Sequence, residues 1–385
     1  MPGRIVIVAG ETSGDNLGAA LIEALTALRP GLEFEGIAGP AMVSAGCRQW
    51  AGSDALAVMG LFEVVKHLPR LLRLRTRIAA RAQALAPLAF IGVDAPEFNL
   101  GLAARLHRAG ITTVQYVSPQ VWAWRQGRVR RMAATLDLVL CLLPFEQAIY
   151  AQAGLAAEFV GHPLADRLPL APDRGAARAR LGIPPDATLV ALLPGSRRGE
   201  VERLASEFLG AAAWLSARRP GLRFIAPLAN AAVQAPFAAA AEQFPGLALT
   251  LTDGGAAEAL TAADVALVAS GTATLETLLC KRPMVVAYRL AAPTAALLRG
   301  LGVNKGRYFA QPNLLAGEQV VPEFFQEAVT PERLGAALLA WLDDAPRRAA
   351  ISMRFTEIHR SLQRGASQRA ARAVLALIDA RSSPA

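Results

Sequence analysis

The feature that most constrains this fold is the alternation of short aliphatic runs with longer helical patterns along the chain. Such alternation is the signature of βαβ units, which build parallel sheets covered by helices on both faces. The sequence therefore predicts an α/β protein. We expect two series of strands, near 5–9, 33–37, 89–93, 112–117, 138–142 and 157–160, and then near 189–193, 223–227, 248–251, 265–269 and 284–288.

A stretch rich in Pro, Arg and Asp at 165–186 separates the two series. Each series is long enough for a doubly wound sheet, and such sheets bind ligands at the carboxyl ends of their strands. We therefore predict a Rossmann-like domain over 1–166 that faces a second one, over 167–345, across a cleft. A helical tail over 346–385 is expected to pack back on the first domain or on a partner protomer in a homodimer.

Composition limits the partners and the compartment. Hydrophobic residues make up 53% of the 385 residues and charged ones 18%, which excludes a disordered chain. The net charge of +9 favours anionic partners such as phosphates, acidic lipid surfaces or nucleic acid. Three lone cysteines, a first strand that leaves no room for a signal peptide, and no apolar run of about 18 residues predict a cytoplasmic protein that does not cross a membrane.

A basic stripe precedes the third strand of the first series. Its members step by four, three, four and four residues along a predicted helix, and they are Lys66, Arg70, Arg73, Arg77 and Arg81. Leu68, Leu72 and Ile78 lie among them, and Pro69 is expected to start or kink the helix. The pattern fits contact with an anionic membrane, and it fits a solvated face equally well. Nucleic acid is disfavoured, because no binding motif is present and aromatics total 6%.

Two strand-to-helix turns in the second half carry groups that suit a nucleotide diphosphate. The first turn is Gly195-Ser196-Arg197-Arg198 after the strand at 189–193, and the second is Ser270-Gly271-Thr272 after the strand at 265–269. Backbone N–H groups at a helix N-terminus favour an anion. Glu276, one turn into the second helix, could accept hydrogen bonds from a ribose. Tight turns with solvated arginines and a serine cap are the alternative.

Familiar competing motifs are absent. The chain contains no G-x-G-x-x-G after a strand, no G-x-x-x-x-G-K-[ST] and no G-x-S-x-G, so dehydrogenase, P-loop kinase and α/β-hydrolase interpretations lose support. It also contains no Asp-x-Asp that could clamp a divalent metal on a diphosphate. We therefore expect no metal and no cofactor, with arginines and helix dipoles balancing the charge of the leaving group.

Carboxylates in the first half could serve as a general base. Asp94 stands at the end of the strand at 89–93, where it could be a base or the N-cap of the next helix. Glu11 and Asp15, with Ser13 between them, follow the first strand and have the same ambiguity. Trp124 could stack on a sugar ring or simply pack in the fold. His162 is expected to have a structural role.

Six segments together resemble the lipid A disaccharide synthases, a family of bacterial glycosyltransferases with the GT-B fold. They are AGETSGD at 9–15, GVDAPEFN at 92–99, YVSPQVWAWR at 116–125, LLPGSRRGEV at 192–201, SGTATLETLL at 270–279 and PNLLAGE at 312–318. The resemblance implies transfer of 2,3-diacylglucosamine from its UDP carrier to 2,3-diacylglucosamine 1-phosphate. The products would be a β-1,6-linked disaccharide and UDP, made at the inner face of the bacterial inner membrane.

The resemblance also implies roles for individual residues. Asp94 matches the proposed base, Arg197 the diphosphate contact, and Glu276 and Asn313 further donor-site residues. From their place in the two turns we also expect the donor to contact Gly195, Ser196, Arg198, Ser270, Gly271, Thr272 and Thr274. From their place in the first half we expect Glu11, Ser13, Asp15 and Trp124 on the acceptor side or elsewhere in the cleft. Two alternatives remain at this point: another GT-B enzyme, such as a UDP-N-acetylglucosamine epimerase or a peptidoglycan-precursor transferase, or a sugar-nucleotide-binding protein without catalysis.

Overall fold

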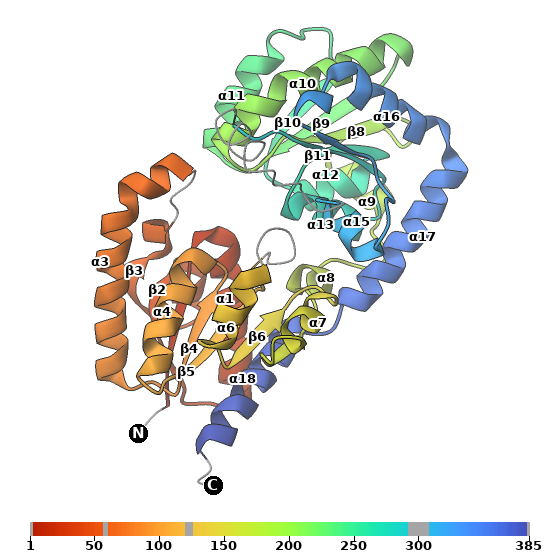
Figure 1. The fold of residues 1–385 in the computed structure, drawn as a ribbon. Coiled ribbons are helices and arrows are strands. Elements are labelled where there is room, and N and C mark those ends of the chain that lie inside the picture. The colour runs from red at the N-terminus through yellow and green to blue at the C-terminus, as the bar shows by residue number, and fades with distance from the viewer. Residues whose placement is uncertain (1–2, 57–60, 120–125, 292–307, 383–385) are drawn as a thin grey trace. The chain divides into compact units, whose positions relative to one another are not determined.

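The computed structural model describes residues 3–56, 61–119, 126–291 and 308–382. The chain forms two compact units, each with its own parallel sheet and flanking helices (Figure 1). Unit 1 comprises Met1–Asp166 and Leu362–Ala385, and unit 2 comprises Arg167–Ser361. The predicted α/β class with two parallel sheets is confirmed.

Unit 1 is built on seven described strands, all parallel, in the order β3-β2-β1-β4-β5-β6-β7. Their bounds are β1 (Arg4–Ala9), β2 (Glu33–Ala38), β3 (Cys47–Gly52), β4 (Ala89–Val93), β5 (Thr112–Tyr116), β6 (Leu138–Cys141) and β7 (Ala157–Phe159). Strands are added in one direction up to β3 and in the other from β4 onward. The pair β1 and β4 is therefore the topological switch point, where open α/β sheets bind their ligands.

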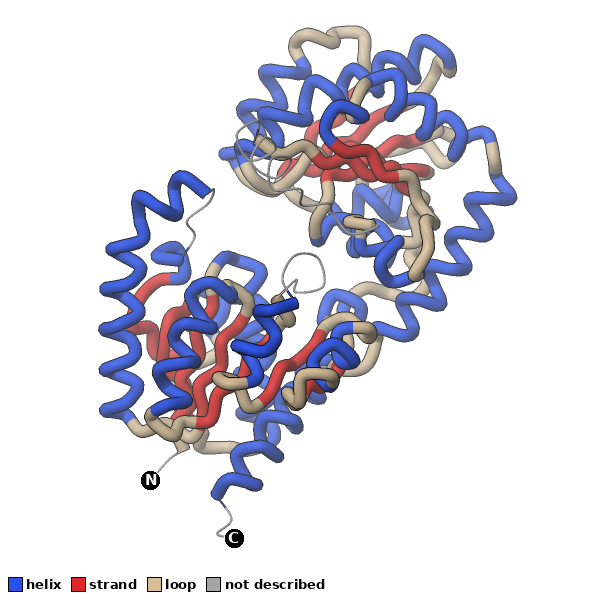
Figure 2. The backbone as a smooth tube through the Cα atoms, in the orientation of Figure 1, coloured by secondary structure: helices blue, strands red, loops and turns tan. Residues whose placement is uncertain are grey.

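Helices cover both faces of this sheet, as Figure 2 shows. They are α1 (Glu11–Leu28), α2 (Pro40–Ser44), α3 (Leu61–Leu85), α4 (Pro96–Arg108), α6 (Gln126–Ala133), α7 (Glu146–Ala151), α8 (Pro163–Arg167) and α18 (Ala366–Ser382). Successive residues of a strand point to opposite faces. Ile5 and Ile7 accordingly pack with α1, α2 and α18, whereas Val6 and Val8 pack with α3, α4, α6 and α7.

The last helix, α18, belongs to unit 1 and completes one face of its core. Val374 and Ile378 are buried against the sheet together with residues of α1. The Asp166 carboxylate accepts hydrogen bonds from the N–H groups of Gly365 (2.9 Å) and Ala366 (2.6 Å) at the start of α18. The predicted tail is thus divided, because α17 (Ala345–Leu362) lies almost wholly in unit 2.

Unit 2 has six described strands, all parallel, in the order β10-β9-β8-β11-β12-β13. They are β8 (Leu189–Leu193), β9 (Arg223–Leu228), β10 (Leu249–Asp253), β11 (Val265–Ala269), β12 (Met284–Tyr288) and β13 (Glu323–Phe325). Its helices are α9 (Arg174–Arg180), α10 (Arg198–Arg218), α11 (Ala231–Ala241), α12 (Ala256–Ala262), α13 (Thr272–Leu279), α15 (Gln311–Ala316), α16 (Pro331–Asp343) and α17. Its switch point lies between β8 and β11.

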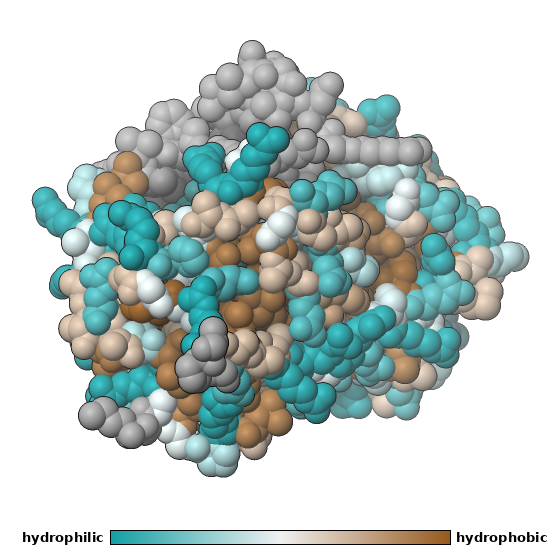
Figure 3. All heavy atoms as spheres, turned by 60° about the horizontal axis from the view of Figure 1, so that its bottom comes forward, coloured by the Kyte–Doolittle hydropathy of each residue, from teal (hydrophilic) through white to brown (hydrophobic). Residues whose placement is uncertain are grey.

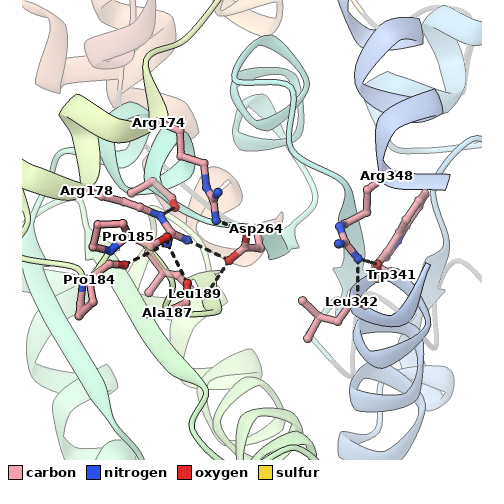
Figure 4. Close-up of polar contacts among 11 residues, drawn as sticks. Arg174, Arg178, Pro184, Pro185, Ala187, Leu189, Asp264, Trp341, Leu342 and Arg348 are labelled. Carbon is pink, nitrogen blue, oxygen red and sulfur yellow. Dashed lines mark hydrogen bonds and ion pairs between the residues drawn. The ribbon is translucent and has the colours of Figure 1, made fainter. Parts of the chain in front are cut away.

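Arg178 anchors the start of unit 2 to its sheet (Figure 4). The side chain is almost completely buried, and its NH2 group donates to the Asp264 carboxylate at 3.0 Å. Its remaining donors go to the backbone carbonyls of Ala262, Pro184, Pro185 and Ala187. A buried guanidinium is stable only when its donors are satisfied in this way. The sequence analysis placed the domain boundary within 165–186. The part of this stretch from α9 onward belongs to unit 2.

The structure differs from the sequence-based expectation in three elements. Two edge strands, β3 and β13, were not predicted. The basic helix α3 begins at Leu61, so Pro69 does not start it but lies inside it.

No described helix is long and apolar enough to span a bilayer. On the face drawn in Figure 3, hydrophilic side chains are interspersed with hydrophobic ones.

Candidate active site

The carboxyl edge of the unit 1 sheet carries a cluster of strained residues. Glu11 (φ 59°) follows β1, Asp94 (φ 52°) and Ala95 (φ 41°) follow β4, and Val117 (φ 75°) follows β5. These strands are neighbours in the sheet. A residue with a side chain in the left-handed region costs about 1–2 kcal/mol. Strain of this kind is concentrated at functional sites, and here it gathers at the switch point.

Asp94 is partly buried and sits directly on this edge. Its N–H donates to the Tyr116 carbonyl of β5 at 2.9 Å. The N-cap of α4 is Ala95, and no side chain caps that helix. The alternative interpretation of Asp94 as a helix cap is therefore wrong, because the left-handed turn moves the cap position one residue along.

The first turn of α1 approaches the Asp94 turn closely. A methyl group added to Gly10 would lie 3.1 Å from Ala95 Cβ, and one added to Gly14 would lie 3.8 Å from Asp94 Cβ. Glu11 is partly buried and Ser13 exposed in this turn. The fold thus brings Glu11, Ser13 and Asp94 to one edge.

Asp15 has a structural role in unit 1, and its contact with the acceptor stays a prediction. The residue is only 3% exposed. Its carboxylate accepts hydrogen bonds from the N–H groups of Gly39 (2.8 Å), Ala41 (2.9 Å) and Met42 (3.1 Å), at the start of α2. Both oxygens are therefore occupied by the N-terminus of a helix, which a carboxylate stabilises.

Two buried amides lie beneath the Asp94 turn, and sequence analysis did not assign either one a role. Asn99 and Gln115 are fully buried and both donate to the Asp94 carbonyl. A signal for Gln115 was present in the sequence, because a polar residue interrupts an otherwise buried strand. A buried polar side chain of this kind is expected to form hydrogen bonds inside the protein, and the alternation of a strand does not show with which partners.

Unit 2 presents two glycine turns on adjacent strands. β8 and β11 pair in parallel, with Val190 opposite Val265. Gly195 (φ 127°) follows β8 and Gly271 (φ 136°) follows β11, in conformations that only glycine adopts readily. The N-termini of α10 and α13 therefore open at the same edge, on either side of the switch point. This arrangement concentrates backbone N–H donors where an anion would bind.

The arginines of the first turn differ in their surroundings. Arg197 is the N-cap residue of α10, about half exposed, with its NH1 3.9 Å from Glu200 Oε1. Arg198 is more exposed and donates to Glu202 on its own helix at 2.7 Å. Burial and the Glu200 charge raise the pKa of Tyr288 at the end of β12, while Arg197 and Arg203 oppose this rise. Ser196 beside it is exposed.

In the second turn, Ser270 is tied to the sheet and the next residues are open. Its N–H donates to the Ala287 carbonyl of β12 at 3.0 Å, while Gly271 and Thr272 are exposed. Burial raises the pKa of Glu276, and the nearby Arg167 charge lowers it by less. A partly buried carboxylate one turn into α13 is suited to accept hydrogen bonds from a polar ligand.

Two residues predicted to contact the donor form hydrogen bonds within unit 2. Thr274 is fully buried, and its hydroxyl donates to the Gly271 carbonyl at 2.7 Å. Asn313 is also fully buried: its amide donates to Val321 O and the Glu323 carboxylate, and its oxygen accepts from two backbone N–H groups. The polar atoms of both residues hold α13 and α15 in place, and their contact with the donor stays a prediction. Trp124 lies outside the described residues.

Two doubly wound parallel-sheet domains of this kind define the GT-B class of glycosyltransferase architecture. Solved structures with the same fold include the glycotransferase of kitacinnamycin (TM-score 0.62, 18% identity, 98% of this chain and 100% of that one). They also include the calicheamicin glycosyltransferase CalG4 (TM-score 0.60, 17% identity, all of both chains). At such identities the likeness shows the fold alone.

A family model described as Lipid-A-disaccharide synthetase matches residues 5–377. The lipid-A-disaccharide synthase of Alkalilimnicola ehrlichii is 52% identical over 376 residues, covering 97% of this chain and 98% of the relative. The Pseudomonas aeruginosa enzyme of the same name is 49% identical, covering 98% and 99%. The chain therefore belongs to the lipid-A-disaccharide synthase family and is a hexosyltransferase. The three alternatives, a UDP-N-acetylglucosamine epimerase, a peptidoglycan-precursor transferase and a non-catalytic binding protein, are therefore excluded.

Proposed function

We propose that this enzyme transfers 2,3-diacylglucosamine from UDP to 2,3-diacylglucosamine 1-phosphate and forms the β-1,6-linked lipid A disaccharide 1-phosphate plus UDP. Membership of the family supports the overall reaction. The observation that carries the chemistry is the pair of glycine turns on the neighbouring strands β8 and β11. It provides two helix N-termini for one pyrophosphate.

The donor diphosphate is held in unit 2. Arg197 and the amides around Gly195 and Ser196 bind one phosphate, and the opening turn of α13 at Gly271 and Thr272 binds the other. These groups also stabilise the charge that develops on the departing UDP, so no metal ion is needed. Arg198 and Ser270 line the same turns, and Glu276 accepts hydrogen bonds from the ribose.

Asp94 acts as the general base. Its carboxylate takes the proton from the acceptor 6-hydroxyl as that oxygen attacks C1 of the donor sugar, and the bond from C1 to the UDP oxygen breaks. Attack from the face opposite UDP inverts the anomeric centre and gives the β linkage. Glu11 and Ser13, on the same edge, contact the acceptor.

The exposed face of α3 contacts an anionic membrane from the cytoplasmic side. Arg70, Arg73 and Arg77 are exposed, and so are Leu68 (44%) and Leu72 (39%). Cationic and apolar side chains on one helix suit the interface of an acidic bilayer. Arg81 differs, because its guanidinium lies 4.5 Å above the Trp50 ring.

Sedimentation with lipid vesicles tests this contact. We expect the protein to bind vesicles that contain phosphatidylglycerol and to bind neutral phosphatidylcholine vesicles far less. The triple variant R70E/R73E/R77E is expected to lose at least about tenfold in affinity for acidic vesicles, since each basic residue contributes about 1 kcal/mol. Equal binding of wild type and variant would contradict the proposal.

The reaction itself is tested by incubation with UDP-diacylglucosamine and diacylglucosamine 1-phosphate, followed by mass spectrometry. We expect the disaccharide 1-phosphate and one UDP for each disaccharide. A matched mixture without the acceptor is the control and should release no UDP. UDP release without a disaccharide, or no turnover of this pair, would contradict the proposal.

A further inference from the structure

Two side-chain amides converge on the main-chain carbonyl of Asp94. Asn99 Nδ2 donates to this oxygen at 2.9 Å and Gln115 Nε2 at 3.1 Å. Asn99 lies in the first turn of α4 and Gln115 on β5, and both are fully buried. The carbonyl is therefore held from two separate elements.

The same amides also serve the strand ends on either side. Asn99 Nδ2 lies 3.2 Å from the Val8 oxygen of β1, and Gln115 Nε2 lies 3.3 Å from the Val117 oxygen after β5. The left-handed residues turn the chain out of the regular sheet at these places. The amides thus connect the Asp94 turn to the ends of β1 and β5 on either side.

Gly92 provides the space for this arrangement. A Cβ atom at this position of β4 would lie 2.8 Å from Asn99 Cβ and 2.9 Å from Gln115 Oε1. Any larger residue would displace both amides from the Asp94 turn. The glycine of the GVDAPEFN segment is therefore explained by what lies against it.

Each of these amides uses its N–H groups but leaves its oxygen without a partner. Asn99 Oδ1 and Gln115 Oε1 are buried, and neither has a hydrogen-bond partner in the described part of the chain. A buried amide oxygen in that state is destabilising, and an apolar side chain of the same shape would avoid the cost. Polar groups that reduce stability are expected where function requires them.

We propose that Asn99 and Gln115 are positioning residues, whose N–H groups hold the Asp94 carbonyl in the left-handed turn and so fix the direction of the Asp94 carboxylate. The inference rests on the proposed function, in which that carboxylate is the general base. It adds that the two amides orient the base indirectly. They hold its main-chain carbonyl and do not contact the substrate themselves.

The test replaces Gln115 by methionine, which keeps the length of the side chain and removes its donor. For Gln115→Met we expect kcat to fall by at least about tenfold, because small misplacement of a catalytic group is costly. KM for both substrates and the Kd of UDP should stay within about twofold of wild type, and the variant should remain folded. A kcat within twofold of wild type would overturn the proposal.

A matched control lies two residues away on the same strand. Thr113 is fully buried, and its hydroxyl donates to the Thr135 carbonyl at 3.0 Å, toward the amino end of β5. Thr113→Val should lower the Tm and leave kcat unchanged. If Thr113→Val lowers kcat as much as Gln115→Met does, the effect is general to the strand and the proposal fails.

A second variant, Asn99→Leu, keeps the proposal testable if Gln115→Met does not fold. It should also lower kcat while leaving KM nearly unchanged. If neither variant folds, the amides have a structural role and the inference is overturned. Asp94→Asn separates this outcome from the proposed function. Full turnover by Asp94→Asn would remove the base itself, whereas an inactive Asp94→Asn with a fully active Gln115→Met contradicts only the positioning role.

Discussion

The chain makes sharp turns at the carboxyl edges of both sheets, but different kinds of residue occupy these turns. Both edges turn the chain sharply at a switch point. In unit 2, glycines take the positive φ angles at Gly195 and Gly271, whereas in unit 1, Glu11, Asp94 and Ala95 take them. Glycine lets a ligand approach the backbone, as a phosphate site requires. A general base must carry a side chain, so the turn in unit 1 contains residues other than glycine in strained left-handed conformations.

The largest expected effect comes from removing the base on the strained edge. Asp94→Asn keeps the shape of the side chain and removes its ability to take a proton. We expect kcat to fall by about 10²–10⁴-fold, the range for loss of a general base. Quantitative mass spectrometry of the disaccharide measures it. A loss of less than about fivefold would mean that the strained edge does not supply the base.

The next effect belongs to the glycine edge. Arg197→Ala removes a charged donor from the first turn of unit 2, and a hydrogen bond between charged groups contributes about 1.5–3 kcal/mol. UDP should bind about 10–100-fold more weakly in calorimetric titration. Arg198→Ala is the matched control, because Arg198 already pairs with Glu202, and its effect should be smaller. Equal losses in the two variants would contradict the assignment.

Much of this organisation was predictable from sequence, because buried parallel strands are continuous aliphatic runs. The strands at 89–93, 189–193, 265–269 and 284–288 have the predicted bounds. β3 was missed because it is an edge strand with exposed Arg48 and Gln49, and β13 because it is an edge strand whose three residues are all only partly buried. Neither resembles a buried strand.

The individual polar residues were harder to predict. Asp15, Thr274 and Asn313 carry the atoms that a ligand site needs, but those atoms bind backbone groups. Sequence shows which donors and acceptors exist and not which are already used. Gln115 is the opposite case, because the sequence analysis gave it no role. Its contacts join residues on different elements and appear only in three dimensions.

A reciprocal pair of substitutions tests whether strain and glycine are assigned correctly. Ala95→Gly should relieve left-handed strain and stabilise the protein by about 1 kcal/mol, with a Tm increase of about 2–4 °C. Gly271→Ala has open space around the new methyl group but a strained φ of 136°, so it should destabilise the protein by about 1–3 kcal/mol. Thermal unfolding measures both changes. Opposite signs would contradict the comparison.

The smallest effect concerns Glu276. Its pKa is raised by burial, so the folded state binds a proton more readily than the unfolded chain, and the group costs stability at neutral pH. Glu276→Gln should therefore have a higher Tm than wild type at pH 7. The difference should vanish as the pH falls below about 4, where the carboxyl group is protonated in both states. A difference that does not change with pH would contradict this.

The division of work between the edges is tested most directly by calorimetric titration of Asp94→Asn with UDP. If unit 2 alone holds the diphosphate, this variant binds UDP with a Kd within about twofold of wild type. Binding weakened tenfold or more would place the strained edge in the UDP site and contradict the central claim.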